Sequence, residues 1–148
     1  MVKILFVCHG NICRSPMAEF VMKDMVKKAG IADRFVIDSA AASREELGNP
    51  IYGPAQRELV KHGILGASHR ARQITRQDLA QYDRIYYMDS RNARYLHQLF
   101  PDFQGFTPFL PYDVAGPWYS GDFTQTWQDI ETGCRQILEE FLCSTTKK

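Results

Sequence analysis

Residues 7–16 read Val-Cys-His-Gly-Asn-Ile-Cys-Arg-Ser-Pro, a short polar loop between two apolar segments. The apolar run 4–7 before the loop predicts a buried strand. After the loop, apolar residues at helical spacing predict a helix over 17–29. A strand, a tight loop and a helix start in succession favour an anion site, because the loop N–H groups and the helix dipole both attract negative charge.

The side chains of this loop fit such a site. Cys8 lies at the strand end near a helix N-terminus, so we expect it to be largely thiolate and nucleophilic. Gly10 lets the backbone turn without a Cβ in the way, and Asn11 tolerates a left-handed conformation. Arg14 offers a planar fork for two phosphate oxygens. Ser15 is expected either to donate to the Cys8 sulfur or to cap the helix.

The pattern Val-Cys-x-Gly-Asn-Ile-Cys-Arg-Ser-Pro-x-Ala-Glu over residues 7–19 resembles the signature of the low-molecular-weight protein tyrosine phosphatases. The likeness continues in Asp38-Ser39-Ala40, in Gly48-Asn49-Pro50, over 68–74, in Met88-Asp89 and over 117–123, so it covers nearly the whole chain. The resemblance implies hydrolysis of phosphotyrosine in proteins, or of small aryl phosphates, with no cofactor and no metal.

Size and composition agree with a single globular domain over residues 1–148. The net charge of +1 argues against nucleic acid as a partner, and no apolar run reaches membrane-spanning length. The N-terminus carries no visible secretion signal, and the four cysteines fit neither a zinc pattern nor a disulfide scaffold. We therefore expect a cytoplasmic protein without a membrane association, present as a monomer or weak dimer.

The rest of the chain alternates strands with helices. Strands are predicted over 35–38, 84–88 and 106–110, the last at a sheet edge because it contains proline. Residues 39–50 are expected to form a loop. Helices are predicted over 53–61, after a Thr75 cap, over 90–99 after a Ser90 cap, and over 123–142. This order indicates an α/β three-layer sandwich, with a central four-stranded parallel sheet, helices on both faces, and the ligand at the carboxyl ends of the strands.

The resemblance also implies a mechanism. Cys8 attacks phosphorus and forms a phosphocysteine intermediate, and Ser15 then assists Cys8 as a leaving group. Arg14 holds the phosphate oxygens together with the backbone N–H groups of the loop. The phosphate-binding residues are expected to be His9, Gly10, Asn11, Ile12, Cys13 and Arg14.

Three further residues take supporting roles by the same resemblance. Ser39 and His69 stand where the family places groups that hydrogen-bond Asn11 and Ser15 and hold the loop in shape. For His69 the alternative is a purely structural histidine. Cys13 is implied as a reversible disulfide partner of Cys8, and the alternative is a plain buried thiol.

Candidate walls of the substrate cleft lie far apart in the chain. Trp118 and Tyr119 stand on the loop that forms one wall in the family and would sandwich a phenyl ring, unless they pack onto the core instead. Glu45 occupies the opposite wall, where the family often has an aromatic residue. Replacement of the aromatic residue by Glu45 predicts weaker binding of aryl groups and weaker binding of acidic peptides.

One departure from the family pattern concerns the general acid. The family has an aspartate directly before the Pro-aromatic-aromatic run, and this chain has Gly116. Loss of the acid is expected to cost about 10²–10⁴ in rate when the leaving group is a phenolate. Three explanations stay open, in this order of preference: a low-activity variant that traps substrate, replacement by Asp113, or replacement by water or Asp122.

Two other functions remain alternatives. A non-catalytic phosphotyrosine-binding module on the same scaffold is favoured by Gly116. A thiol-coupled arsenate reductase shares the loop type, but it needs a further pair of redox cysteines in a mobile segment. Because Cys134 and Cys143 fall in a helical pattern, we rank this function last.

Overall fold

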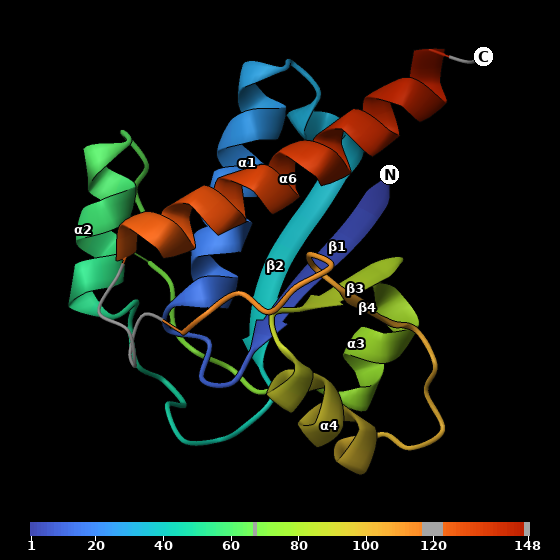
Figure 1. Ribbon diagram of the computed structural model, residues 1–148. Helices are drawn as coiled ribbons and strands as arrows, with labels where there is room; N and C mark the ends of the chain where they lie inside the picture. Colours follow the sequence, from blue (N-terminus) through green and yellow to red (C-terminus); the bar gives the residue numbers. More distant parts are fainter. Residues whose placement is uncertain (67, 117–122, 147–148) are drawn as a thin grey trace.

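The computed structural model describes residues 1–66, 68–116 and 123–146, in which a parallel sheet lies between two groups of helices (Figure 1). The sheet has the strand order β2-β1-β3-β4, and its neighbouring strands are all parallel. Its strands are β1 (Val2–Cys8), β2 (Phe35–Ala41), β3 (Arg84–Tyr87) and β4 (Phe106–Pro108). The expected α/β sandwich with a four-stranded parallel sheet is confirmed.

Helices cover both faces of the sheet, as predicted. On one face lie α1 (Arg14–Lys28), α2 (Gly53–Lys61) and α6 (Phe123–Thr146), and on the other lie α3 (Arg76–Gln81) and α4 (Ser90–Leu99). A short 3₁₀ turn, η1 (Ala32–Arg34), leads into β2. Within the described residues, no helix combines the length and the apolar character that a bilayer crossing requires.

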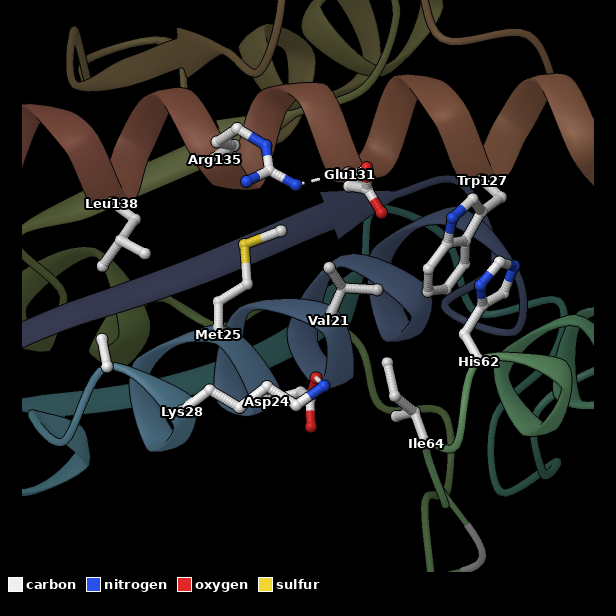
Figure 2. Close-up of a pocket in the computed structure, with 11 residues that line it drawn as sticks. Val21, Asp24, Met25, Lys28, His62, Ile64, Trp127, Glu131, Arg135 and Leu138 are labelled. Atoms are coloured by element: carbon white, nitrogen blue, oxygen red, sulfur yellow. Dashed lines mark hydrogen bonds and ion pairs between the residues drawn. The ribbon is translucent and has the colours of Figure 1, made fainter.

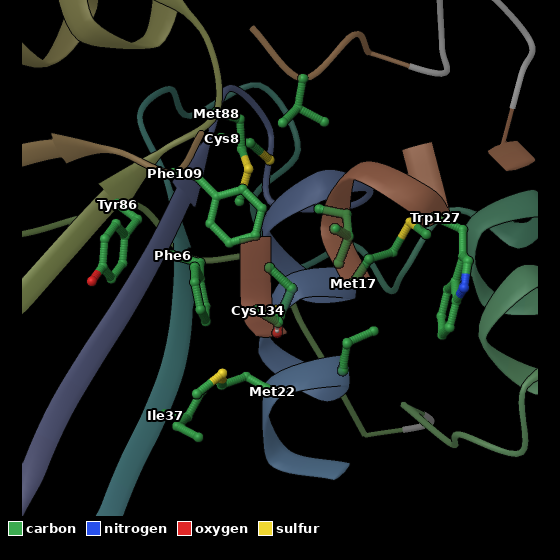
Figure 3. Close-up of a cluster of buried hydrophobic side chains, with 14 of the residues drawn as sticks. Phe6, Cys8, Met17, Met22, Ile37, Tyr86, Met88, Phe109, Trp127 and Cys134 are labelled. Carbon is green, nitrogen blue, oxygen red and sulfur yellow. Dashed lines mark hydrogen bonds between the residues drawn. The ribbon is translucent and has the colours of Figure 1, made fainter. Parts of the chain in front are cut away.

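Strand β1 connects the two halves of the core. Its side chains alternate between the faces, so Ile4 and Phe6 join the cluster under α1 and α6, whereas Leu5 and Val7 join the cluster under α3 and α4. Figure 3 shows Phe6 in the first cluster, between Tyr86 and the helix side chains. Because β1 has neighbours on both edges and helices on both faces, its carboxyl end at Cys8 is held from every side.

Strand β1 runs over Val2–Cys8 instead of 4–7, and β3 ends at Tyr87 instead of residue 88. The larger differences are at the ends of β2 and β4. Ser39 was expected in a loop, but β2 continues to Ala41 and pairs with β1 up to Cys8, because the small buried residues at its end fit closely beside β1. Strand β4 ends at Pro108 instead of residue 110, because its neighbour β3 ends at Tyr87, the register partner of Pro108.

The helix starts also need two corrections. Helix α1 begins at Arg14 rather than at residue 17, because the Met17 N–H already bonds to the Cys13 carbonyl. The cap of α4 is Asp89 rather than Ser90, in a capping box with Asn92. Two boundaries agree with the prediction: Thr75 caps α3, and α2 spans the predicted range 53–61. Helix α6 begins at the predicted Phe123 but continues to Thr146 instead of residue 142.

Gly133 tests the packing of α6 on the sheet. Alanine in a helix interior is ordinarily more favourable than glycine by up to about 1 kcal/mol. At position 133, however, a Cβ would lie 2.2 Å from the ring of the buried Phe109. Overpacking of this kind costs about 1–3 kcal/mol. We therefore expect Gly133→Ala to lower the free energy of unfolding by about 1–2 kcal/mol in denaturant titrations.

The matched control is the same substitution in a Phe109→Leu background, where the ring is absent and the loss should shrink. A gain in stability from Gly133→Ala alone would contradict this packing account.

Candidate active site

The loop between β1 and α1 turns three carbonyl groups away from its centre, toward the surrounding chain. Their donors are Ser43 N to His9 O at 3.0 Å, His69 Nε2 to Asn11 O at 2.8 Å, and Tyr52 N to Ile12 O at 2.8 Å. In a planar trans peptide the next N–H points opposite to the carbonyl. The N–H groups of Gly10, Ile12 and Cys13 therefore face the inside of the loop. They have no acceptor within the described residues, so they form a cup of donors for an oxyanion.

The Cys8 sulfur lies at the base of this cup. It faces the Asn11 N–H at 3.3 Å and the Ser15 hydroxyl oxygen at 3.0 Å. The Ser15 oxygen accepts a hydrogen bond from Asn11 Nδ2 at 2.8 Å, so its own proton can go to the sulfur at 3.0 Å or to the Ala40 carbonyl, which is farther away at 3.5 Å. Of the two roles foreseen for Ser15, the geometry favours donation to Cys8, because Ser15 lies inside α1 and Cys13 occupies the cap position.

Asn11 holds the cup in shape. Its backbone has a φ of 60°, the left-handed region anticipated for it, and among the described residues it is the only one other than glycine there. Its buried side chain donates to Ser15 at 2.8 Å and to Ser39 at 2.9 Å, and it accepts from the Arg72 N–H at 3.2 Å. These contacts restrain both the side chain and the unusual backbone, and they bring Ser39 to the expected place.

Glu19 is a supporting residue that the sequence reasoning missed. It is 4% exposed and accepts a hydrogen bond from Ser39 Oγ at 2.6 Å. The same carboxylate oxygen lies 4.0 Å from His69 Nδ1, and its other oxygen pairs with Lys23 at 2.5 Å. The available signal was its helical position four residues after Ser15, which turns it to the same inner face of α1.

Arg14 is held against the cleft by one nitrogen. Nη1 donates to Asp89 Oδ2 at 2.6 Å and to the Val114 carbonyl at 2.7 Å. In the described part of the chain Nε and Nη2 have no such partner, so they remain for an anion in the cleft. Burial alone raises the pKa of Asp89, but hydrogen bonds from Arg14 and from the Asn92 N–H outweigh burial and lower it below its usual value.

The sequence reasoning quoted Asp89 but gave it no role. Its position two residues after β3 is a usable signal, because the carboxyl ends of neighbouring parallel strands meet at one edge of the sheet.

Cys13 and Cys8 are both free thiols in this structure. Burial, and then the nearby Cys8, raise the pKa of the Cys13 thiol to about 12. Cys13 is therefore a neutral thiol at physiological pH, and the disulfide implied by the resemblance stays a prediction.

A cleft of about 720 Å³ opens above Arg14. Of the predicted site residues, it is lined by Arg14, His9, Glu45, Asp113 and Gly116. Among the described residues, Cys8, Ser15 and the loop residues 10–13 are not part of this lining. Glu45 pairs with His9 at 3.0 Å. Trp118 and Tyr119 lie outside the described residues.

Helix α4 forms a wall of this cleft that the sequence reasoning did not foresee. Its exposed contributors are Arg91, Arg94 and Tyr95. Asp113 joins this wall, since its carboxylate accepts hydrogen bonds from the Ser90 N–H at 3.1 Å and from the Ser90 hydroxyl at 3.0 Å.

A second hollow of about 470 Å³ lies between α1 and α6 (Figure 2). His62 stacks on Trp127 at one end, with ring centroids 3.6 Å apart. Its charged side chains pair within their own helices, as Glu131 does with Arg135 at 3.3 Å. No cysteine or serine lines it, and within the described ranges no three His, Cys, Asp or Glu side chains gather as a metal site. The cleft above Arg14 is the candidate active site.

Comparisons with known proteins identify the family of the chain. A family model described as "Low molecular weight phosphotyrosine protein phosphatase" matches residues 3–146. The low molecular weight protein-tyrosine-phosphatase YfkJ of Bacillus subtilis is 38% identical over 93% of this chain and 94% of its own, and a human low molecular weight phosphotyrosine protein phosphatase is 37% identical with the same coverage.

Solved structures are similar over the same length. The crystal structure of YfkJ superposes with a TM-score of 0.92 and 35% identity, covering 97% of this chain and 96% of its own. The crystal structure of SP-PTP, a low molecular weight protein tyrosine phosphatase from Streptococcus pyogenes, superposes with a TM-score of 0.88 and 39% identity. The match covers 95% of this chain and 93% of that one.

A cysteine at the base of a loop of inward N–H groups, at the carboxyl end of a parallel sheet, defines a cysteine-dependent phosphatase. With the family model and these relatives, the chain belongs to the low molecular weight phosphotyrosine protein phosphatase family.

The role of Asn11 is testable by stability. Asn11→Ala removes three hydrogen bonds and leaves a Cβ in the left-handed region, whereas Asn11→Gly removes the bonds alone. We expect both to destabilise by about 1–3 kcal/mol, and alanine to cost about 1 kcal/mol more than glycine. Denaturant titrations measure both effects.

Asn49→Ala, which removes an exposed amide bonded to Glu46, is the control and should change little. Equal stabilities of the alanine and glycine variants would contradict the claim of backbone strain.

Proposed function

We propose that this chain hydrolyses phosphotyrosine in proteins and small aryl phosphates through a phosphocysteine intermediate at Cys8. The observation that carries the proposal is the cup of inward N–H groups above the Cys8 sulfur. Arg14, at the start of α1, lines the cleft with Nε and Nη2 available for an anion. Such donors stabilise the charge that develops on the phosphoryl oxygens in the transition state. The names of the relatives support the same reaction.

The reaction proceeds in two displacements. Cys8 Sγ attacks phosphorus, the bond between phosphorus and the aryl oxygen breaks, and the leaving oxygen takes a proton from solvent or from an acid. Water then attacks the phosphocysteine, loses a proton, and releases phosphate and the Cys8 thiolate. Ser15, 3.0 Å from the sulfur, stabilises the departing thiolate.

Gly116 sets the expected limit on turnover, because a glycine cannot donate the proton that a phenolate needs. Asp113 lines the same cleft, but both oxygens of its carboxylate already accept hydrogen bonds from Ser90. We therefore place Asp113 second, as a residue that fastens the cleft wall to α4. The favoured account is a phosphatase that binds aryl phosphates well and expels poor leaving groups slowly.

Gly116 also favours a second candidate, a phosphotyrosine-binding module without turnover. A stoichiometric burst of product from a good leaving group separates the two, because a pure binder releases none. The arsenate reductase alternative finds no support in the described residues. Cys134 is fully buried in α6, where burial raises the pKa of its thiol well above the usual range, so it is not placed for a thiol relay.

The proposed setting is the cytoplasm, because a working thiolate needs a reducing compartment. The chain is proposed to act as one domain, as a monomer or weak dimer, without nucleic acid or membrane. Its net charge of +1 supports the choice of protein or small-molecule substrates.

Cys8→Ser tests the nucleophile. We expect loss of p-nitrophenyl phosphate turnover by at least about a thousandfold, because serine is a far weaker nucleophile here. Phosphate binding, measured by calorimetry, should remain, since the N–H cup and Arg14 are unchanged. Cys143→Ser, at the exposed end of α6, is the matched control and should keep full activity. Turnover retained in Cys8→Ser would refute the mechanism.

Gly116→Asp tests the missing acid. We expect it to raise phenyl phosphate turnover by about 10²-fold or more, and p-nitrophenyl phosphate turnover far less, because p-nitrophenolate leaves without protonation. Rates for a series of aryl phosphates with different leaving groups measure this contrast.

Asp113→Asn tests the second explanation, in which Asp113 replaces the missing general acid. If Asp113 supplies the proton, this change removes the fall in rate on the high-pH side of the pH–rate profile, because that limb follows deprotonation of the general acid. An unaltered profile, together with a gain in Gly116→Asp, agrees with the absent acid. No gain in Gly116→Asp would count against it.

A further inference from the structure

The α4 wall of the cleft carries two arginines whose guanidinium groups form no ion pair with the described acidic groups. Arg91 and Arg94 are exposed and line the same cleft as Arg14. Residues three apart in a helix lie on one face, so the two guanidinium groups point to the same region. Neither forms an ion pair within residues 1–66, 68–116 and 123–146, in contrast to Arg14, which pairs with Asp89.

Each acidic side chain of the cleft forms an ion pair or a hydrogen bond with a residue other than Arg91 and Arg94. Glu45 pairs with His9 at 3.0 Å, and Asp89 pairs with Arg14 at 2.6 Å. Asp113 accepts two hydrogen bonds from Ser90. The expectation that Glu45 disfavours acidic peptides therefore meets an opposing feature, because Glu45 and Asp89 have basic partners, whereas the α4 arginines have no acidic partner among the described residues.

The form of this wall suits a peptide. Tyr95 packs edge-on against His9, with ring centroids 6.0 Å apart, and remains 37% exposed beside the arginines. The cleft volume of about 720 Å³ lies in the range of sites that take a whole ligand rather than one side chain. A chain segment that enters the cleft beside Arg14 thus meets an aromatic ring and two guanidinium groups along α4.

We propose that Arg91 and Arg94 form a second anion subsite, which selects phosphotyrosine segments with acidic side chains beside the phosphorylated residue. This inference rests on the proposed function of the Cys8 loop. Arginine pairs with carboxylates through a planar fork, and an exposed pair contributes a modest factor. Two such pairs predict a five- to tenfold preference, on the order of the measured strength of surface ion pairs.

The test compares the binding of two phosphotyrosine peptides to the Cys8→Ser chain by calorimetry. One peptide has Asp and Glu beside the phosphotyrosine, and the other has Ala and Gln there. We expect the acidic peptide to bind about five- to tenfold more tightly at low salt, and this ratio to fall toward one at high salt.

Variants of α4 assign the preference. Arg91→Ala with Arg94→Ala should abolish the ratio, and Arg91→Glu with Arg94→Glu should reverse it against the acidic peptide. The lysine pair, Arg91→Lys with Arg94→Lys, should keep part of it. Arg135→Ala, at an exposed arginine of α6, is the matched control and should leave the ratio intact.

The outcomes separate this inference from the proposed function. Equal binding of the two peptides, or a ratio that survives the double alanine variant, overturns the subsite. Failure of both peptides to bind overturns the subsite and the phosphate cup together. Absence of p-nitrophenyl phosphate turnover in the unaltered chain would overturn hydrolysis alone, since the binding preference is measured without it.

Discussion

The site depends on a left-handed backbone at Asn11, which turns the carbonyls of the loop outward and its N–H groups inward. That conformation costs a residue with a Cβ about 1–2 kcal/mol, so the surroundings must stabilise it. A continuous chain of hydrogen bonds does so. Glu19 accepts from Ser39, Ser39 accepts from Asn11, and Asn11 donates to Ser15 beside the Cys8 sulfur. The nucleophile and the oxyanion cup are therefore products of one network.

Arg14 is positioned by a different principle, the convergence of parallel strands. Strand β1 ends at Cys8, and its neighbour β3 ends just before Asp89, so both residues reach the same edge of the sheet. Asp89 both caps α4 and grips Nη1 of Arg14. One carboxylate thus couples the start of a helix on one face of the sheet to the arginine at the start of α1 on the other.

The order of strands and helices and the loop over 7–16 could be predicted, because apolar periodicity and a dense local motif are readable within a few residues. The full length of β2 could not be predicted, since Ser39 and Ala41 are strand residues only because β1 lies beside them. Glu19, Arg91 and Arg94 escaped notice for a similar reason. A charged residue in a helix reads as solvent-exposed until the tertiary structure shows which cleft or buried partner it faces.

The central place of β1 has a consequence for how the protein loses its site. Amide hydrogens of a strand that is covered on both faces and paired on both edges exchange with solvent mainly through global unfolding. The nucleophile therefore sits at the end of the segment that opens last, whereas α4, with its arginines, packs on the opposite, smaller cluster. Recognition of a substrate's flanks can fluctuate with α4 while the reactive sulfur keeps its place.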